Sequence, residues 1–437
     1  MPTAAYHTLG CKVNQYDTQA MEELLTEAGY ETVPFSADAD LYLVNTCTVT
    51  GTGDKKSLQT VRRLRREHPQ SKIIICGCLA QLRGTSLLNT GADLILGTQR
   101  RGEIVSLLSR VMASGRPLCA VEPIAKNTPF ENLCVSRQTE HTRAVLKIQE
   151  GCRNRCSYCI IPLVRGPIRS RPLPDIFAEA HRLSDAGFCE IVLTGIHISS
   201  YGRDLPEDIS LTDVILRLQQ VDKIRRIRLG SLEPTVVTPS FVSVIRQAPK
   251  LCPQFHLALQ SGSDTVLQRM RRRYNTAQYL QAVENIRSVF PRAALTTDIL
   301  TGFPGETEEE FRQTEEMIRR VGFARIHVFP YSPRPHTDAA LMPLQLPDAV
   351  RQERARRLIA VGGETSAQYR RTWLNQETEL LPEETVNGCW EGYTPEYLRV
   401  RISREQSCVS GVPVRIRIVS ADQPTLMGEI ISQPIPE

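Results

Sequence analysis

The chain begins with an alternation of apolar runs and amphipathic segments. Up to about residue 120, the runs ADLYLVNTC, KIIICGCLA and ADLILGT alternate with the helical patterns QAMEELLTEAG and KKSLQTVRRLRREHP. Apolar runs without internal polar residues fit strands buried on both faces, and helices between them connect parallel strands. We therefore predict a parallel α/β domain over residues 1–120.

A second alternation follows an aperiodic segment, residues 121–143, which we interpret as a linker. From Ala144 onward, strand-like runs alternate with helical patterns; the runs are AVLKI, CEIVLTG, RIRLGSL, FHLALQ, ALTTDILTGF and RIHVFPYS. This pattern predicts a partial (β/α)6 barrel over residues 144–369, with the functional face formed by the loops that follow the strands.

The last region, residues 370–437, has short alternating runs and few helical signals. Its runs ETELLPEET, YLRVRI, PVRIRIVSA and LMGEIIS are separated by turn residues. They predict a small all-β barrel of about five strands. In VRIRIV, arginines alternate with apolar residues, so one strand face is expected to be buried and the other basic.

The composition restricts the class of protein and the cellular compartment in which we expect it. With 437 residues, 41% hydrophobic and 23% charged, the chain is typical of a soluble globular protein. No apolar run approaches the roughly 18 residues of a membrane span, and MPTAAYHTLGCKVN lacks the features of a signal peptide. We expect a cytoplasmic protein. Most of its 53 basic residues are arginines, which favours a nucleic-acid partner, although codon usage explains the same bias.

Three cysteines lie close together directly after the first strand of the second alternation. The stretch EGCRNRCSYCII contains Cys152, Cys156 and Cys159. In a reducing compartment, cysteines at short spacings more often bind metal than form disulfides. A structural zinc normally takes four ligands, whereas a four-iron cluster with three thiolates keeps one iron open for chemistry. The alternative is a zinc knuckle or a chance cluster.

Three further cysteines each follow an apolar run of the first alternation. Cys11, Cys47 and Cys78 end the runs HTLGC, LVNTC and IIICGC. If these strands are parallel, the three positions lie along one sheet edge and can hold a second cluster with an open iron. Cys76 competes with Cys78; we favour Cys78, because it follows Gly77 and leaves the strand. The alternative for each cysteine is a small buried apolar residue.

The cysteine motifs resemble a known family. C-x3-C-x2-C followed by an apolar pair resembles the signature of the radical S-adenosylmethionine (radical SAM) superfamily. TLGCKVNQYDTQ, NTCTVT and CGCLAQ are similar to the methylthiotransferases of that superfamily, which end in a TRAM β-barrel. The resemblance covers essentially the whole chain. It implies S-adenosylmethionine (SAM) as a cofactor and two [4Fe-4S] clusters, with the ligands Cys11, Cys47, Cys78, Cys152, Cys156 and Cys159. The other seven cysteines match no motif.

Further segments are similar to one bacterial branch of this family. TGIHISSYGRDL, RIRLGSLEP and WEGYTPEYLRV resemble the enzymes that act on threonylcarbamoyladenosine in tRNA. The ribosomal-protein branch has proline where this chain has Lys12, and the isopentenyladenosine branch usually reads GCQMN. The resemblance implies methylthio transfer to C2 of N6-threonylcarbamoyladenosine next to the anticodon. The alternatives are a sibling branch or a non-catalytic RNA-binding iron–sulfur protein.

Polar or small residues at the predicted strand ends are candidates for SAM binding. In barrels of this type, such positions are more often functional than structural. The candidates are Gly195, Glu233, Gln260 and Asp298. Tyr158, one residue before Cys159, is a further candidate that would pack on the adenine of SAM; the alternative is that it supports the loop. We expect His197 and His256 to be packed or hydrogen-bonded, and Phe303 to Glu306 to form a turn that leads into a helix.

Arginine clusters are candidates for tRNA phosphate contacts. They are Arg165, Arg169 and Arg171, the run from Arg269 to Arg273, and Arg399, Arg401, Arg415 and Arg417. The alternative for each is a solvated face, which we prefer for residues 62–68 (RRLRREH). The resemblance also implies an electron donor such as flavodoxin or ferredoxin and a sulfur source. We expect a monomer without membrane contact.

Overall fold

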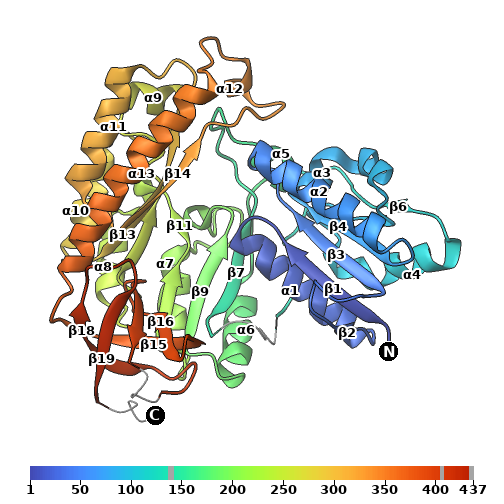
Figure 1. Cartoon of the computed structure of the whole chain (residues 1–437), viewed down its shortest axis with the longest axis horizontal. Coiled ribbons are helices and arrows are strands. Elements are labelled where there is room, and N and C mark those ends of the chain that lie inside the picture. The colour runs from blue at the N-terminus through green and yellow to red at the C-terminus, as the bar shows by residue number, and fades with distance from the viewer. Residues whose placement is uncertain (136–141, 404–407, 433–437) are drawn as a thin grey trace.

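The computed structural model describes residues 1–135, 142–403 and 408–432. The N-terminal domain lies beside a central open barrel, and a small β-barrel packs below the latter (Figure 1). Across the described ranges, no helix combines the length and the apolar character that a membrane span requires.

The N-terminal domain is a parallel sheet with helices on both faces, as predicted. Its strand order is β2-β1-β3-β4-β5-β6, and its strands are β1 (Thr3–Thr8), β2 (Glu31–Thr32), β3 (Leu41–Thr46), β4 (Lys72–Gly77), β5 (Leu94–Ile95) and β6 (Leu118–Cys119). The helices are α1 (Lys12–Glu27), α2 (Gly51–Glu67), α3 (Cys78–Arg83), α4 (Ile104–Ser114) and the 3-10 segments η1 (Gly84–Thr90) and η2 (Arg101–Glu103). One core lies between the sheet and α1 and α4, and a second lies under α2.

The central barrel contains all six predicted strands, in two sheets. The sheet orders are β10-β9-β7-β8 and β11-β12-β13-β14. The strands are β7 (Ala144–Glu150), β8 (Arg169–Ser170), β9 (Glu190–Gly195), β10 (Arg226–Leu229), β11 (Ser231–Leu232), β12 (Gln254–Leu257), β13 (Ala294–Thr301) and β14 (Arg325–Pro330). The run RIRLGSL is divided between β10 and β11, one in each sheet, and a parallel bridge from Ile227 to Leu251 lies where the sheets meet.

Helices cover the outer face of this barrel, which leaves it open on the side of the N-terminal domain (Figure 1). They are α5 (Ile161–Arg165), α6 (Leu173–Asp185), α7 (Leu211–Leu218), α8 (Pro239–Arg246), α9 (Asp264–Arg269), α10 (Thr276–Arg287), α11 (Glu308–Val321), α12 (Asp338–Leu341), α13 (Asp348–Arg371), η3 (Ile198–Ser200) and η4 (Pro234–Val236). In β7, Leu146 and Ile148 join the large core under these helices. Because side chains alternate along a strand, Lys147 and Gln149 belong to the opposite, inner face.

The C-terminal region forms a closed barrel of the order β15-β16-β17-β19-β18. Its strands are β15 (Glu377–Val386), β16 (Cys389–Tyr393), β17 (Arg399–Ile402), β18 (Val414–Ser420) and β19 (Leu426–Ser432). The alternation predicted for β18 is confirmed: Val414, Ile416 and Ile418 are buried in the barrel, whereas Arg415 and Arg417 are exposed.

Two buried arginines of β10 fix this small barrel to the central one. Arg226 Nη1 donates to the carbonyl of Tyr393 at 3.0 Å, and Arg228 Nη1 donates to the carbonyl of Pro395 at 2.8 Å. The guanidinium of Arg228 also lies over the ring of Tyr397, 4.7 Å from its centroid. The turn between β16 and β17 is therefore part of a packed, hydrogen-bonded interface.

Candidate active site

The loop between β7 and α5 contains Cys152, Cys156 and Cys159, which we call the loop triplet. The Cys159 amide donates to the Cys156 carbonyl at 3.0 Å, which folds the loop back on itself. Two donors point at its sulfurs: the Asn154 amide lies 3.4 Å from Cys152 Sγ, and Arg272 Nη1 lies 3.0 Å from Cys156 Sγ. The triplet is thus placed where the barrel architecture predicts function.

Glu233 organises the side chains beside the loop triplet. It accepts from Arg272 Nη2 at 2.8 Å and from Asn154 Nδ2 at 2.9 Å, and His197 Nε2 lies 3.2 Å from its other oxygen. Burial opposes ionisation of this carboxyl, but hydrogen bonding to His197 and the charge of Arg272 outweigh it and lower the pKa of Glu233 to about 2. Glu233 is therefore a carboxylate at neutral pH and holds two residues that contact cysteine sulfur.

The other predicted SAM positions lie in different surroundings. Tyr158 packs edge-on against Phe303, with ring centroids 6.5 Å apart. A Cβ at Gly195 would lie 2.9 Å from the Gln149 carbonyl, so close packing against β7 by itself explains the glycine.

Gln260 follows the end of β12, whereas Asp298 lies within the neighbouring strand β13 and not, as predicted, at its end. Gln260 has a φ of +66°, a conformation unusual for a residue with a side chain, and its amide donates to the Asp298 carbonyl at 2.9 Å. His256 Nε2 lies 3.4 Å from the Asp298 carboxylate, and His256 Nδ1 lies 3.1 Å from Thr296 Oγ1. The prediction that His256 and His197 are hydrogen-bonded or packed is confirmed. Phe303 to Glu306 form the predicted turn before α11.

The second set, Cys11, Cys47 and Cys78, is called here the sheet triplet. Cys11 precedes α1, Cys47 follows β3, and Cys78 opens α3 directly after β4, so all three lie at the carboxyl edge of the parallel sheet. Gly10 has a φ of +106°, and a Cβ there would lie 3.2 Å from Cys47 Sγ. The loop that carries Cys11 is thereby brought against Cys47.

Cys76 and Cys78 face different surroundings. Cys76 lies within β4, and its side chain belongs to the core under α1 and α4, 3.8 Å from the Val44 carbonyl. The Cys78 sulfur lies outside the strand and accepts a hydrogen bond from Arg165 Nε at 3.2 Å. These surroundings favour Cys78 as the ligand.

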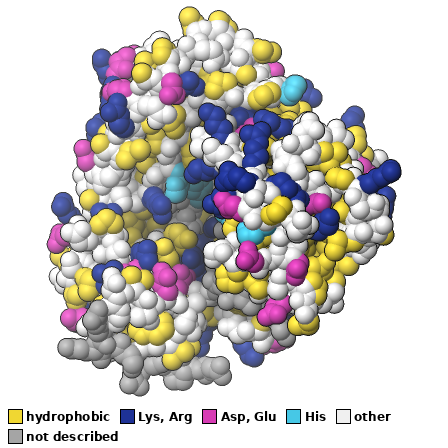
Figure 2. All heavy atoms as spheres, turned by 45° about the vertical axis from the view of Figure 1, so that its right-hand side comes forward, with side chains coloured by type: hydrophobic (Ala, Val, Ile, Leu, Met, Phe, Trp, Pro, Cys, Tyr) yellow, Lys and Arg dark blue, Asp and Glu magenta, His cyan; other side chains and the backbone are white. Residues whose placement is uncertain are grey.

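The two triplets are joined by packing between their elements. Helix α3, which begins at Cys78, contacts α5 of the central barrel, and Cys78 shares one apolar cluster with Ile160 and Val164. Ile160 directly follows the last cysteine of the loop triplet. The surface is hollowed between the N-terminal domain and the central barrel, and Lys and Arg side chains gather beside the hollow (Figure 2).

A second contact joins the domains on the other side of the sheet triplet. Arg334, from the segment after β14, donates to Thr48 Oγ1 at 2.7 Å and to Asp54 Oδ2 at 2.6 Å. The Gly51 amide donates to Ser332 Oγ at 3.0 Å. The segment that follows Cys47 is therefore anchored to the central barrel.

The donor sets fit two clusters with an open iron. Each triplet offers three sulfurs and at least one N–H donor, and hydrogen bonds to sulfur are a known means of tuning clusters. Burial raises the pKa of Cys78 and Cys152 to about 11 and that of Cys159 to about 12, so ligation would have to displace their protons. Across the described residues, no three His, Cys, Asp or Glu side chains form a single-ion site; a cluster spreads its thiolates over different irons.

One prediction of phosphate contacts was wrong. Arg165, Arg169 and Arg171 are almost fully buried, and Arg171 pairs with the buried Glu179 at 2.6 Å. Their segment follows the loop triplet in the chain, and Arg165 contacts Asn14, Asp17 and Cys78 of the N-terminal domain. Carboxylates of other elements pair with Arg165 and Arg171, which the sequence alone does not reveal.

The other arginine clusters divide into buried and exposed members. Arg272 is buried against the loop triplet, whereas Arg271 is exposed and pairs with Asp338. The arginines of the small barrel are partly exposed and paired with glutamates: Arg399 and Arg401 with Glu391, and Arg415 and Arg417 with Glu377.

Two family models match the chain. The model described as radical SAM superfamily matches residues 146–318, and the model described as uncharacterized protein family UPF0004 matches residues 3–97. A solved radical SAM methyltransferase, TsrM from Kitasatospora setae, has a similar fold, with a TM-score of 0.58 and 14% identity over 78% of this chain and 77% of its own. The central barrel is therefore that of a radical SAM enzyme, a class that uses SAM and a [4Fe-4S] cluster.

Curated relatives match nearly the whole chain. The threonylcarbamoyladenosine tRNA methylthiotransferase MtaB of Bacillus subtilis is 40% identical over 99% of this chain and 97% of its own length. A tRNA-2-methylthio-N(6)-dimethylallyladenosine synthase of Syntrophobacter fumaroxidans is 37% identical over 98% and 95%. The chain belongs to the tRNA methylthiotransferase family of radical SAM enzymes.

Proposed function

We propose that this chain adds a methylthio group to C2 of N6-threonylcarbamoyladenosine next to the anticodon of tRNA. The observation that carries the proposal is the 40% identity, over nearly the full length, to a relative named for that substrate. The relative named for dimethylallyladenosine is less similar, at 37%. The segments around Lys12 and TGIHISSYGRDL also favour the first branch over its siblings.

In this proposal, the loop triplet holds the cluster that binds SAM, and the sheet triplet holds a second [4Fe-4S] cluster. When bound, SAM and the clusters supply the methyl group, the sulfur and the radical that an unactivated aromatic carbon requires. The packing of α3 against α5 supports a shared reaction space, because it links Cys78 with the segment that follows Cys159. The side chains of the protein thus orient both sites toward one base.

The side chains around the loop triplet have positioning roles in this proposal. Arg272 and Asn154 donate to the triplet, and Glu233 holds both of them in place. SAM is bound by Tyr158, Gly195, Glu233, Gln260 and Asp298. Burial raises the pKa of Tyr158 well above its ordinary range, so that it offers a neutral ring and hydroxyl beside the cluster.

The tRNA is held by the N-terminal domain (1–120), the radical SAM barrel (144–369) and the TRAM barrel (370–437) together. A base in a single-stranded loop can be turned outward and read by stacking and by contacts to its edge. The exposed arginines of the TRAM barrel supply phosphate contacts. A flavodoxin or ferredoxin delivers electrons, a separate sulfur source replenishes the second cluster, and the enzyme works as a cytoplasmic monomer.

The test is mass spectrometry of tRNA nucleosides from cells that lack the gene. We expect 2-methylthio-threonylcarbamoyladenosine to disappear and its unthiolated precursor to accumulate, and the intact gene to restore the product. A copy with Cys152→Ala should not restore it, which separates catalysis from mere binding of the RNA. An unchanged level of this nucleoside, with loss of the methylthio-isopentenyl product, would assign the chain to the sibling branch.

A further inference from the structure

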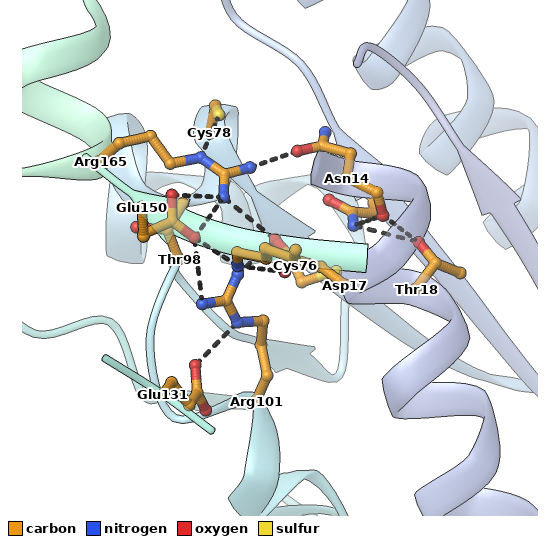
Figure 3. Close-up of polar contacts among 12 residues, drawn as sticks. Asn14, Asp17, Thr18, Cys76, Cys78, Thr98, Arg101, Glu131, Glu150 and Arg165 are labelled. Atoms are coloured by element: carbon orange, nitrogen blue, oxygen red, sulfur yellow. Dashed lines mark hydrogen bonds and ion pairs between the residues drawn. The ribbon is translucent and has the colours of Figure 1, made fainter. Parts of the chain in front are cut away.

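Arg165 occupies an unusual place between the two domains. It ends α5 of the central barrel and is fully buried. Its guanidinium reaches three kinds of partner (Figure 3). Nε donates to Cys78 Sγ at 3.2 Å, Nη1 lies 3.0 Å from Asp17 and 3.1 Å from Glu150, and Nη2 donates to Asn14 Oδ1. Every N–H edge of this side chain thus faces a fixed acceptor.

The surrounding residues form a larger charged group, buried except for the partly exposed Glu131, which we call the Arg165 charge cluster. Its cations are Arg101, Lys147, Arg165 and Arg169, and its carboxylates are Asp17, Glu131 and Glu150. Lys147 Nζ lies 2.6 Å from Asp17 and 2.5 Å from Glu150. Within the described residues, Arg169 has no carboxylate at ion-pair distance, and its Nη2 donates to the Arg165 carbonyl at 2.8 Å.

The charge cluster therefore contains one more cation than it has carboxylates. A buried charge that lacks a counterion is costly, typically by several kcal/mol. Besides the carboxylates, Arg165 donates to Asn14 Oδ1 and to Cys78 Sγ, and of these two acceptors the sulfur belongs to the sheet triplet. This contact places the positive charge of the cluster directly against a sulfur of the sheet triplet.

Arg171 provides an internal comparison. It is as deeply buried as Arg165 and comes from the same segment of the chain, but it pairs with Glu179 at 2.6 Å. The sulfur near it belongs to Cys134, at 3.6 Å, which is not in either triplet. Burial and pairing are thus shared by both arginines, while the contact with a triplet sulfur is found at Arg165.

We propose that Arg165 is a positioning residue for the sheet triplet: it orients the Cys78 sulfur through the Nε–H hydrogen bond and raises the reduction potential of the cluster bound there. This inference rests on the proposed second cluster. A nearby positive charge and a hydrogen bond to sulfur both stabilise the reduced, more negative form of an iron–sulfur cluster. Since Asp17 and Glu150 come from different domains, the potential also depends on the packing between those domains.

The test is a redox titration of the sheet-triplet cluster, followed by electron paramagnetic resonance. The full-length parent carries C152A, C156A and C159A, so that one cluster remains after anaerobic reconstitution. Arg165→Gln should lower the midpoint potential, and Arg165→Lys should lower it less, because it keeps the charge but not the planar fork. Asp17→Asn removes a neighbouring negative charge and should raise it. Arg171→Lys should leave it unchanged.

The outcomes separate the inference from the function on which it rests. Unchanged potentials in the Arg165 and Asp17 variants, or an equal shift in Arg171→Lys, would overturn the role of Arg165 and leave the proposed function intact. A parent that binds no cluster would overturn both. If Arg165→Gln fails to fold, the opposite shifts expected for Arg165→Lys and Asp17→Asn decide the question.

Discussion

The loop triplet and the sheet triplet each present three cysteine sulfurs, but the chain brings them together in different ways. A single loop supplies Cys152, Cys156 and Cys159, whereas the ends of parallel strands supply Cys11, Cys47 and Cys78. Each triplet also receives a hydrogen bond from one buried arginine, Arg272 or Arg165. A local motif and a tertiary arrangement thus provide a similar donor set, but only the second depends on the whole domain.

Removal of either triplet should give the largest effect and separate their roles. We expect C152A/C156A/C159A and C11A/C47A/C78A each to lose about four irons per chain. The loop variant should no longer cleave SAM to 5'-deoxyadenosine, whereas the sheet variant should cleave it without forming methylthio product. Iron analysis and chromatography check this. A sheet variant with full iron content would contradict the assignment.

Substitution of Arg272, the arginine beside the loop triplet, should have the next largest effect on stability and iron content. Arg272→Met leaves Glu233 buried without its main cation, and breaking such a pair costs about 3–5 kcal/mol. Thermal unfolding and iron content are the measurements. Arg228→Met is the matched control, because it breaks another buried pair, with Glu190, at the interface with the small barrel. Both variants should be less stable, and only Arg272→Met should also lose iron.

Acid should weaken the surroundings of the loop triplet in a definite pH range. The pKa of Glu233 lies at about 2 in the folded chain, below its ordinary value of 4.5. A depressed pKa stabilises the folded chain at pH values above the ordinary pKa of the group, and this stabilisation is lost as the pH falls toward 2. The pKa shift corresponds to a contribution of about 3 kcal/mol to the free energy of unfolding. The unfolding midpoint should therefore fall more steeply with acid in the parent than in Glu233→Gln. Equal slopes would show that Glu233 is not held in this way.

A substitution of Cys76 tests how the sheet triplet is composed. Cys76→Ser places a hydroxyl in the core under α1 and α4, which costs about 1–3 kcal/mol. It should keep its full iron content, whereas Cys78→Ser should lose the sheet-triplet cluster. Iron analysis of the two variants side by side gives the answer, and loss of iron in Cys76→Ser alone would reverse the ligand assignment.

The smallest effect is expected far from both triplets. Arg415→Gln/Arg417→Gln removes two exposed charges of the TRAM barrel that pair with Glu377. Binding of tRNA should weaken a few-fold, and the salt dependence of log Kd should fall by about 1 per lost phosphate contact. Arg62→Gln/Arg63→Gln, on the exposed face of α2, is the control expected to bind normally. An unaltered salt slope in the barrel variant would exclude these arginines from the RNA contact.

Much of the fold was predictable, because apolar periodicity is a local property. All six strands of the central barrel and the alternation in β18 agree with their sequence patterns. Helix α13 and strand β16 were not singled out: α13 is rich in arginine and carries Gly362 and Gly363 in its interior, which obscures the helical pattern. A Cβ at Gly362 would lie 2.4 Å from Ile326, so close packing on β14 explains that glycine.

The site was predictable most directly where its residues are neighbours in the sequence. The loop triplet follows from spacing alone, and the sheet triplet needed the assumption of parallel strands. The roles of Arg165 and Asn154 were missed, because their partners Asp17 and Glu233 lie far away along the chain. A run of arginines in a sequence reports charge, but not whether acidic groups elsewhere will bury and neutralise it.

The Arg165 charge cluster also bears on whether the protein can be divided. Asp17 and Arg101 belong to the N-terminal domain, whereas Lys147, Glu150 and Arg165 belong to the central barrel. A fragment cut at the linker would expose each half of this group to water without its counterpart and would lose the interface that buries it. The two domains, although each has its own sheet, are therefore expected to be inseparable as stable fragments and to unfold in a single concerted step.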